Sequence, residues 1–184
     1  MPRYIAFLRA INVGGHTVKM DRLRVIFESL GFANVETFIA SGNVVFESMA
    51  QDTAALETSI ATALQAALGY QVATFVRTDA ELTRIATHEA FPQPLLDAAQ
   101  ALNIAFLATP LDAEAVRKLM ALKTVIDDFA THEREIYWLC LKKQSESTFS
   151  NAVLEKTLGR QSTLRGANTV QKMAAKYGPA EAQP

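Results

Sequence analysis

The sequence predicts an α+β protein built from two successive β-α-β-β-α-β units, packed as one compact body and followed by a C-terminal helix. Three observations predict this class. Hydrophobic residues make up 49% of the 184 residues, which is enough for a sizeable core. Strand-like and helix-like apolar patterns then follow one another in the same order twice. The tetrapeptide IAFL of residues 5–8 also recurs at residues 104–107.

The first unit is expected over about residues 3–88. RYIAFLRA predicts a strand, and DRLRVIFESLG predicts a helix that Asp21 caps and Gly31 ends. NVETFIA and NVVFE predict a hairpin with SGN as its turn. TAALETSIATALQAALG predicts a second helix, and YQVATFVRT a fourth strand. A short helix then starts at Thr78, which has capping-box spacing to Glu81.

HEAFPQPLLDAAQAL is interpreted as a connector to a second unit over about residues 102–177. NIAFLAT predicts its first strand, AEAVRKLMAL a helix, and TVIDDFAT with REIYWLCL a hairpin. SNAVLEKTLG is a helix, QSTLRG a short strand and NTVQKMAAKYG the last helix. Residues 178–184 are expected to form a flexible tail.

A β-α-β-β-α-β unit is the ferredoxin-like arrangement, so the sequence predicts two ferredoxin-like subdomains in tandem. The strands are apolar on both faces: Tyr4, Ala6 and Leu8 alternate with Ile5 and Phe7. Strands of this kind are covered on both sides. We therefore expect each open sheet face to be buried against the other half or a partner chain, giving one compact domain over residues 1–184.

The totals disfavour several classes of protein. The net charge is −1, whereas nucleic-acid binders usually carry a basic excess, so nucleic acid is a disfavoured partner. Cys140 is the only cysteine and cannot form an intramolecular disulfide. The first residues lack a signal-peptide pattern, and no apolar window is long enough to span a membrane. We expect a cytoplasmic protein with no membrane partner, and the oligomeric state stays open.

The stretch FLRAINVGGHTVKM, which follows the first strand, is the main candidate site. Gly14 and Gly15 allow close backbone approach, and a helix start after the loop could present N–H groups to an anion. Arg9 and Lys19 could add positive charge, and Asn12 a polar contact. The spacing fits neither GxxxxGKS nor GxGxxG, so no nucleotide cofactor is predicted. A glycine-rich connection with solvated basic residues is the alternative reading.

Topology predicts a second segment beside this loop. The first and second strands of such a unit run parallel with the third between them, so the loop and the SGN turn should share one rim. Ser41, Gly42 and Asn43 are then candidate ligand contacts. They are also the residues that a tight hairpin turn needs, which leaves a purely structural reading open.

A second polar cluster is expected near the C-terminus, where Lys156 and Arg165 could bind an anion. Local pairing and helix capping are the structural alternative. The cluster consists of Asn151, Glu155, Lys156, Arg165, Asn168 and Thr169. No metal site is expected, because the three histidines are far apart and neither HE pair extends to HExxH.

Four blocks of the sequence carry a family resemblance: YIAFLRAINVGG, LRVIFESLGFANVETFIASGNVVFES, NAVLEKTLG and TLRGANTVQKM. Together they resemble the bacterial domain-of-unknown-function family 1697, from about residue 3 to residue 177. The resemblance implies a tandem of ferredoxin-like subdomains and no established activity. Members often carry RNWNTV where this chain has RGANTV, so Gly166 and Ala167 replace an Asn and a Trp, which alters either a site or only packing.

Three functions remain open at this point, and whether the protein is an enzyme is undecided. The first hypothesis is a protein that binds a small polar or anionic ligand at the rim formed by residues 9–19 and 41–43. The second is a nucleic-acid-binding module, although neither third strand, NVVFE or EIYWLCL, has the RNP1 pattern of an RRM. The third is a protein–protein scaffold without a ligand.

Overall fold

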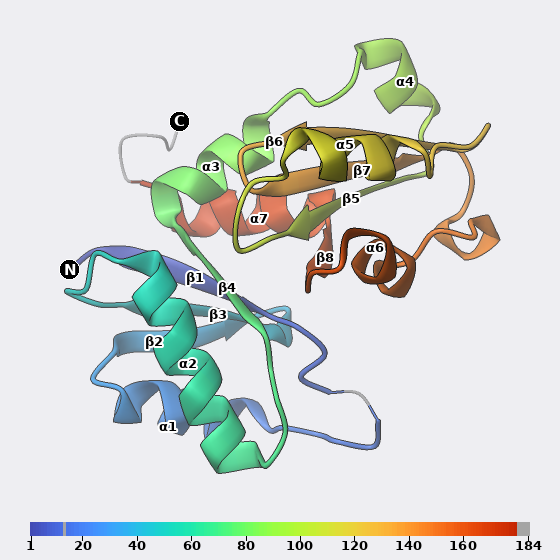
Figure 1. Cartoon of the computed structure of the whole chain (residues 1–184). Helices are drawn as coiled ribbons and strands as arrows, with labels where there is room; N and C mark the ends of the chain where they lie inside the picture. Colours follow the sequence, from blue (N-terminus) through green and yellow to red (C-terminus); the bar gives the residue numbers. More distant parts are fainter. Residues whose placement is uncertain (13, 180–184) are drawn as a thin grey trace. The chain divides into compact units, whose positions relative to one another are not determined.

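The computed structural model describes residues 1–12 and 14–179 of the chain. Contacts between residues divide it into two units. The first contains residues 1–84 and the chain from Gln171 onward, and the second contains residues 85–170. In the described residues each unit carries one four-stranded antiparallel sheet (Figure 1). The predicted α+β class is therefore confirmed, whereas the packing of the halves into one body stays a prediction.

The first unit is built around four strands and the helices that connect them. These elements are β1 (Arg3–Leu8), α1 (Met20–Ser29), β2 (Ala33–Phe38), β3 (Ala40–Glu47), α2 (Thr53–Leu68), β4 (Thr74–Thr78), the start of α3 (Asp79–Thr87) and the end of α7 (Ala167–Tyr177). The sheet order is β2-β3-β1-β4, so β3 lies between β1 and β2. In Figure 1, α1 and α2 lie along the same side of this sheet.

The core of the first unit follows from strand alternation. Tyr4, Ala6 and Leu8 of β1 share one buried cluster with the apolar stripes of α1 and α2. Ile5 and Phe7 point to the opposite face and are also buried. Both faces of this central strand are thus withdrawn from water, as its apolar alternation predicts.

Helix ends in the first unit match the sequence signals with one exception. Asp52 caps α2 by accepting from the N–H of Ala54 at 2.9 Å, and Gly69 ends the helix at φ 82°. Gly31, at φ 80°, follows α1. The predicted cap at Asp21 is wrong, because α1 begins one residue earlier, at Met20, and Lys19 takes the N-cap position.

The second unit repeats the arrangement. After α3 come α4 (Gln93–Ala98), β5 (Ala101–Phe106), α5 (Ala113–Met120), β6 (Asp127–His132), β7 (Glu135–Cys140), a 3₁₀ turn η1 (Gln144–Glu146), α6 (Asn151–Leu158), β8 (Thr163–Gly166) and the start of α7. The sheet order is β6-β7-β5-β8. Trp138 and Cys140 of β7 lie in its buried core.

The connector between the units contains a helix that the sequence reading missed. Pro92 occupies the N-cap position of α4, and Pro94 lies in its first turn. Proline is tolerated there, because the N–H groups of a first turn have no intrahelical partner to lose. By contrast, the predicted capping box is confirmed: Thr78 N–H donates to Glu81 Oε2 at 2.8 Å, and Glu81 N–H donates to Thr78 Oγ1 at 3.1 Å.

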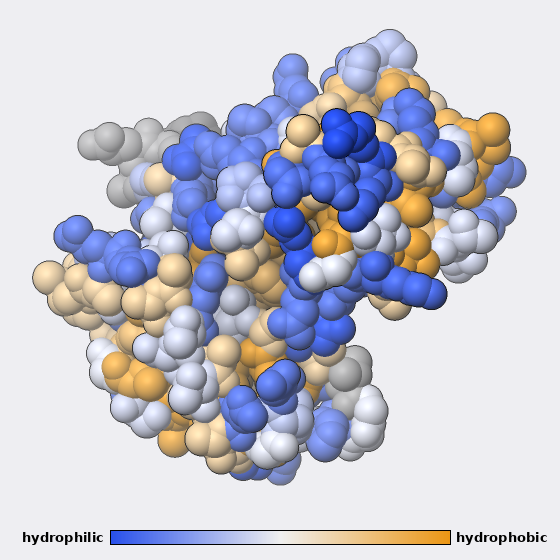
Figure 2. All heavy atoms as spheres, in the orientation of Figure 1, coloured by the Kyte–Doolittle hydropathy of each residue, from blue (hydrophilic) through white to orange (hydrophobic). Residues whose placement is uncertain are grey.

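The outer side of α2 has little charge. The helix contains no Lys or Arg, and its exposed residues are mainly Ala, Ser and Thr, which appear as pale or tan atoms in Figure 2. This surface is unlike the basic stripe by which proteins hold a polyanion. Among the described residues, none of the helices combines the length and the apolar character needed to cross a membrane.

Candidate functional site

The glycine loop, residues 9–19, connects β1 to α1. Ala10, Gly14 and Gly15 adopt positive φ values of 53°, 64° and 81°. An ideal Cβ placed on Gly15 would meet no atom within 4 Å, so only the backbone conformation requires a glycine there. The pair of glycines therefore bends the chain in a way that other residues would resist.

Side chains fasten this loop at both ends. Asn12 Oδ1 accepts from the N–H of Val18 at 2.8 Å, and the Tyr70 hydroxyl donates to the Ile11 carbonyl at 2.8 Å. The His16 ring stacks on the Tyr70 ring with centroids 4.1 Å apart. Asn12, predicted as a ligand contact, therefore also has a structural role, because it ties its own position to Val18 across the two glycines.

The predicted cations lie at the two ends of the glycine loop. Arg9 is half-buried, and its backbone N–H donates to the Ala73 carbonyl at 2.9 Å. Lys19 is exposed at the N-cap position of α1, where its backbone is extended. Its side chain makes no hydrogen bond to the first turn of this helix. The N-cap residue therefore leaves the positive end of α1 without a cap of its own.

The predicted turn at residues 41–43 is wrong. All three residues belong to β3, and the chain reverses at Ile39, which has a positive φ of 63°. Buried Asn43 donates from Nδ2 to the Phe38 carbonyl at 3.1 Å, which fixes the reversal nearer the start of the strand. Gly42 is buried too, and the side chain of Ser41 lies outside the described residues.

The shared rim is nevertheless consistent with the strand register. Phe7, near the end of β1, pairs with Asn43, near the start of β3. The glycine loop and the β2–β3 reversal therefore leave the same end of the sheet. Of the residues proposed there, Gly42 and Asn43 are used inside the strand, whereas Lys19 is exposed beyond it.

The second predicted cluster divides into a structural part and an exposed part. Asn151 Nδ2 donates to Glu155 Oε1 at 2.7 Å and to the Ser162 carbonyl at 2.9 Å, and Ser162 Oγ donates back to Asn151 Oδ1 at 2.6 Å. The Ser150 hydroxyl caps α6 by accepting from Val153 N–H at 3.2 Å. Asn151 and Glu155 thus hold α6 to the segment before β8.

The remaining members of this cluster differ in burial. Arg165 donates to Thr163 Oγ1 at 2.7 Å and to the Leu164 carbonyl at 2.8 Å, and burial lowers the pKa of Arg165 to about 10. It stays cationic at neutral pH. Lys156 and Asn168 are exposed, and Thr169 is half-buried in the first turn of α7.

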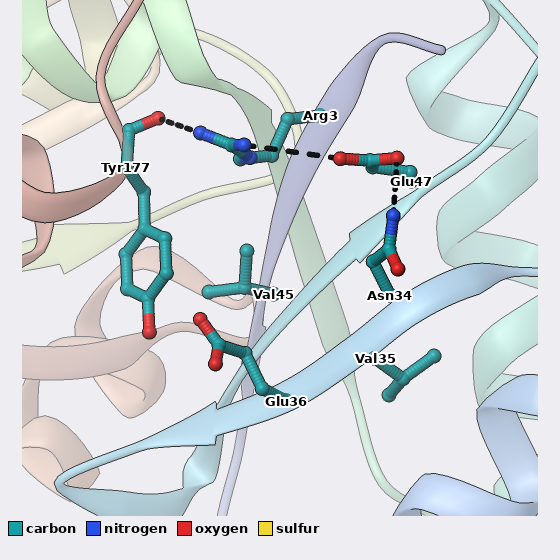
Figure 3. A pocket seen from close by; sticks show the side chains of 7 residues that line it. All are labelled: Arg3, Asn34, Val35, Glu36, Val45, Glu47 and Tyr177. Carbon is teal, nitrogen blue, oxygen red and sulfur yellow. Dashed lines mark hydrogen bonds and ion pairs between the residues drawn. The ribbon is translucent and has the colours of Figure 1, made fainter.

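A pocket in the first unit was not foreseen. It encloses about 380 Å³ and is formed by β1, β2, β3 and the end of α7. Figure 3 shows the seven side chains that line it, which are Arg3, Asn34, Val35, Glu36, Val45, Glu47 and Tyr177. No short motif marks it, because Arg3 and Tyr177 are 174 positions apart.

Two buried ionic groups also escaped the sequence reading. Asp127 is 2% exposed and accepts from Trp138 Nε1 at 2.8 Å and from Ser147 Oγ at 2.9 Å. Arg77 is 1% exposed and lies 3.8 Å from Glu57 Oε1. Both satisfy the rule that buried charges have polar partners, which makes them structural groups.

Metal binding has no support in the part of the chain that the structure describes. His, Cys, Asp and Glu residues there do not gather in groups of three or more that could hold an ion. The His88 and His132 rings stack with their centroids 3.9 Å apart and an interplanar angle of 11°.

Comparison with known proteins gives a family. A family model described as "Protein of unknown function (DUF1697)" matches residues 1–137. The chain belongs to the DUF1697 family. The match covers both segments of the proposed rim and most of the pocket, whereas Tyr177 and the second polar cluster lie beyond it. The resemblance read from the sequence is therefore confirmed over this range.

The fold of this DUF1697 protein is also seen in a solved structure. It is that of a conserved bacterial protein from Streptococcus pneumoniae, with a TM-score of 0.76 and 22% sequence identity. The likeness covers 94% of this chain and 97% of the other. No curated protein matches the sequence. The comparisons thus supply a family and a fold, and the function has to be argued from the site.

Proposed function

We propose that this DUF1697 protein binds a small anionic or polar ligand at the glycine loop of its first unit. One observation carries the proposal. Two left-handed glycines precede α1, and its N-cap residue, Lys19, makes no side-chain hydrogen bond to the first turn. Backbone N–H groups at a helix N-terminus favour an anion, because they are unpaired donors at the positive end of the helix dipole.

The charge of the segment supports the same ligand class. Residues 9–24 contain four cationic side chains and one acidic side chain, Asp21. The cations are Arg9, Lys19, Arg22 and Arg24. The Asp21 carboxylate lies 3.7 Å from the Arg24 guanidinium, so part of the negative charge of Asp21 is offset by its own neighbour. The whole chain has a net charge of −1, which makes this positive segment a local feature.

A pair of capping variants tests this function. Lys19→Asp places a carboxylate where the anion would lie, and an Asp N-cap stabilises a helix by about 1 kcal/mol. We expect Lys19→Asp to raise the melting temperature while abolishing the shift that inorganic phosphate, AMP or citrate gives the wild type. Lys19→Ser adds a neutral cap and should keep part of the shift, because the loop cations remain.

Lys142→Asp is the matched control, since it makes the same charge change at an exposed site of the second unit. It should leave the anion shift intact. An anion shift that survives Lys19→Asp would place binding elsewhere and contradict the proposal. If none of the three anions shifts the wild type, the proposal also fails. A low-salt gel shift with single-stranded RNA would then favour the nucleic-acid reading, and its absence the scaffold reading.

We also infer that both units are ferredoxin-like subdomains. Three features support this inference: the two sheets have equivalent strand orders, their neighbouring strands all pair antiparallel, and a β-α-β-β-α-β sequence of elements leads through each unit. This topology brings the ends of β1 and the start of β3 to one rim, which is the geometry that the proposed site uses.

A further inference from the structure

The pocket of the first unit lies toward the opposite end of the sheet from the glycine loop. Arg3 pairs with Glu47 in the strand register, whereas Phe7, near the loop, pairs with Asn43. Arg3, Glu47, Val45 and Glu36 share one sheet face, because they are cross-strand partners or lie two residues apart. The volume of about 380 Å³ falls at the small end of the range for ligand pockets.

A β-bulge shapes this pocket. The register advances three residues in β2, from Ala33 to Glu36, but only two in β3, from Glu47 to Val45. Asn34 lies inside the bulge at a φ of 50°, a conformation that Asn tolerates better than most residues. Its Nδ2 donates to Glu47 Oε2 at 2.8 Å. The bulge thus aims the Glu47 carboxylate at the pocket, as bulges near functional sites often do.

The charged groups around the pocket are only loosely paired. Arg3 Nη2 lies 3.8 Å from Glu47 Oε1, and Lys176 Nζ lies 3.6 Å from Glu36 Oε1. Both separations are longer, by about 1 Å, than the 2.7–2.9 Å of a charge-assisted hydrogen bond. A contact this long leaves room for another polar group between or beside the partners. One cation, Arg3, and two carboxylates, Glu36 and Glu47, therefore line the pocket in contacts that leave room for a further polar partner, and Lys176 adds positive charge beside Glu36.

The hydroxyl of Tyr177 supplies an independent sign of a missing partner. Tyr177 is 4% exposed and lines the pocket, yet within the described chain its hydroxyl has no hydrogen-bond partner. Figure 3 shows the hydroxyl beside the Glu36 carboxylate. A buried, unsatisfied hydroxyl is costly, and such groups in native proteins often mark a water or ligand position.

We propose that this pocket binds a small zwitterion of the α-amino-acid class. Its carboxylate lies on the Arg3 guanidinium, and its ammonium lies on the Glu36 carboxylate and the Tyr177 hydroxyl. Val45, which lies between the Arg3 and Glu36 side chains in Figure 3, forms the apolar floor under the ligand's α-carbon. This site is separate from the glycine loop and does not depend on the function proposed there.

A ligand with both charges fits better than one with a single charge. A simple anion would be repelled by the Glu36 and Glu47 carboxylates, and a simple cation would be repelled by Arg3. A zwitterion instead meets a complementary charge at each of its ends. Repulsion between like charges on the site and on a wrong ligand is a common source of specificity. Arg3 is further fixed for this role, because its Nη1 donates to the Tyr177 carbonyl at 3.2 Å.

Titration calorimetry on the full chain tests the proposal, with each of the standard free L-amino acids as a probe. We expect at least one to bind. Its N-acetyl form, which lacks the ammonium, and its C-terminal amide, which lacks the carboxylate, should each bind at least about tenfold more weakly. Equal binding of the amide would show a cation site, and binding of none of the amino acids would show no such site; either result overturns the proposal.

Three variants locate the site. Arg3→Met and Glu36→Gln should each weaken binding about tenfold or more, and Tyr177→Phe should weaken it without unfolding the protein, since it removes only the hydroxyl. Glu114→Gln is the control, because it breaks an exposed ion pair with Lys118 in the second unit. Binding that all three pocket variants retain would overturn the proposal. Lys19→Asp should leave this binding unchanged, which separates the two sites.

Discussion

The two ends of the first unit's sheet present different chemical groups: backbone groups at the glycine loop and charged side chains at the pocket. At the glycine loop, backbone groups are fixed by Asn12 and Tyr70 through hydrogen bonds of 2.8 Å each. At the pocket, charged side chains stand in long pairs, with Arg3 3.8 Å from Glu47. Short hydrogen bonds fix the backbone conformation at the glycine loop. The longer ion pairs at the pocket leave its charged groups able to bind a further polar group.

This difference teaches where ligand specificity can come from on a single sheet. The end formed by backbone groups presents N–H donors, which can bind many kinds of anion. An end shaped by paired side chains presents both signs of charge and selects a ligand that carries both. If the comparison is right, substitutions at one end should leave binding at the other unchanged.

The largest expected effect concerns the Tyr177 ring. Tyr177 is buried and packs edge-on against Phe38, with centroids 5.5 Å apart, so Tyr177→Ala should lower the free energy of unfolding by about 3–5 kcal/mol. Tyr177→Phe keeps the ring and removes an unpartnered hydroxyl, so it should leave stability unchanged or raise it. Urea unfolding of the two variants measures both. A marked loss in Tyr177→Phe would show that the hydroxyl has a structural partner and would weaken the pocket proposal.

A smaller loss is expected at the other end, from Gly15→Ala. Gly15 has φ 81° and open space around its Cβ position, so the cost is conformational only, about 1–2 kcal/mol. Gly166→Ala makes the same change where the space is also open and φ lies outside the left-handed region, and it should be neutral or slightly stabilising. Equal unfolding energies for the two variants would contradict the account of the loop.

The β2–β3 reversal offers a gain of similar or smaller size. Ile39 has a positive φ of 63°, and its side chain is 61% exposed. The backbone strain at Ile39 is therefore offset by little burial of its side chain. Ile39→Asn should stabilise the first unit by about 1 kcal/mol, because Asn adopts this conformation more readily. Thermal unfolding provides the measurement, with Val25→Asn, an exposed change in mid-helix α1, as a control expected to change stability little, because Val and Asn have similar helix propensities. A lowered melting temperature for Ile39→Asn would refute the strain argument.

The same contrast explains what the sequence could predict. Apolar periodicity, Gly69, Gly159 and the Thr78–Glu81 spacing are local signals, and they gave the elements and their order. The SGN turn failed because Gly42 attracted the turn assignment, whereas Ile39 adopts the left-handed conformation and Asn43 holds the Phe38 carbonyl. A propensity for turns was overridden by a specific side-chain contact.

The pocket could not be predicted for a different reason. Its lining residues come from three strands and a helix end, and none has a distinctive neighbour in the sequence. The bulge at Asn34 shifts the register by one residue, which no alternation pattern in NVETF reveals. The burial of Asp127 could not be predicted either, because its partner Trp138 becomes adjacent only when β6 pairs with β7.

The smallest effect is a pH dependence at the pocket end. Burial, and then the adjacent Glu36 carboxylate, raise the pKa of Tyr177 above its usual value near 10, and Tyr177 in turn raises the pKa of Lys176. A raised folded-state pKa gives stability that is complete below about pH 10 and is lost as the pH climbs toward the folded value. Between about pH 9 and 11, wild type should therefore lose unfolding free energy more steeply than Tyr177→Phe. Urea unfolding at several pH values measures the two slopes; parallel slopes would mean that the Tyr177 hydroxyl is no more shielded in the folded protein than in the unfolded chain.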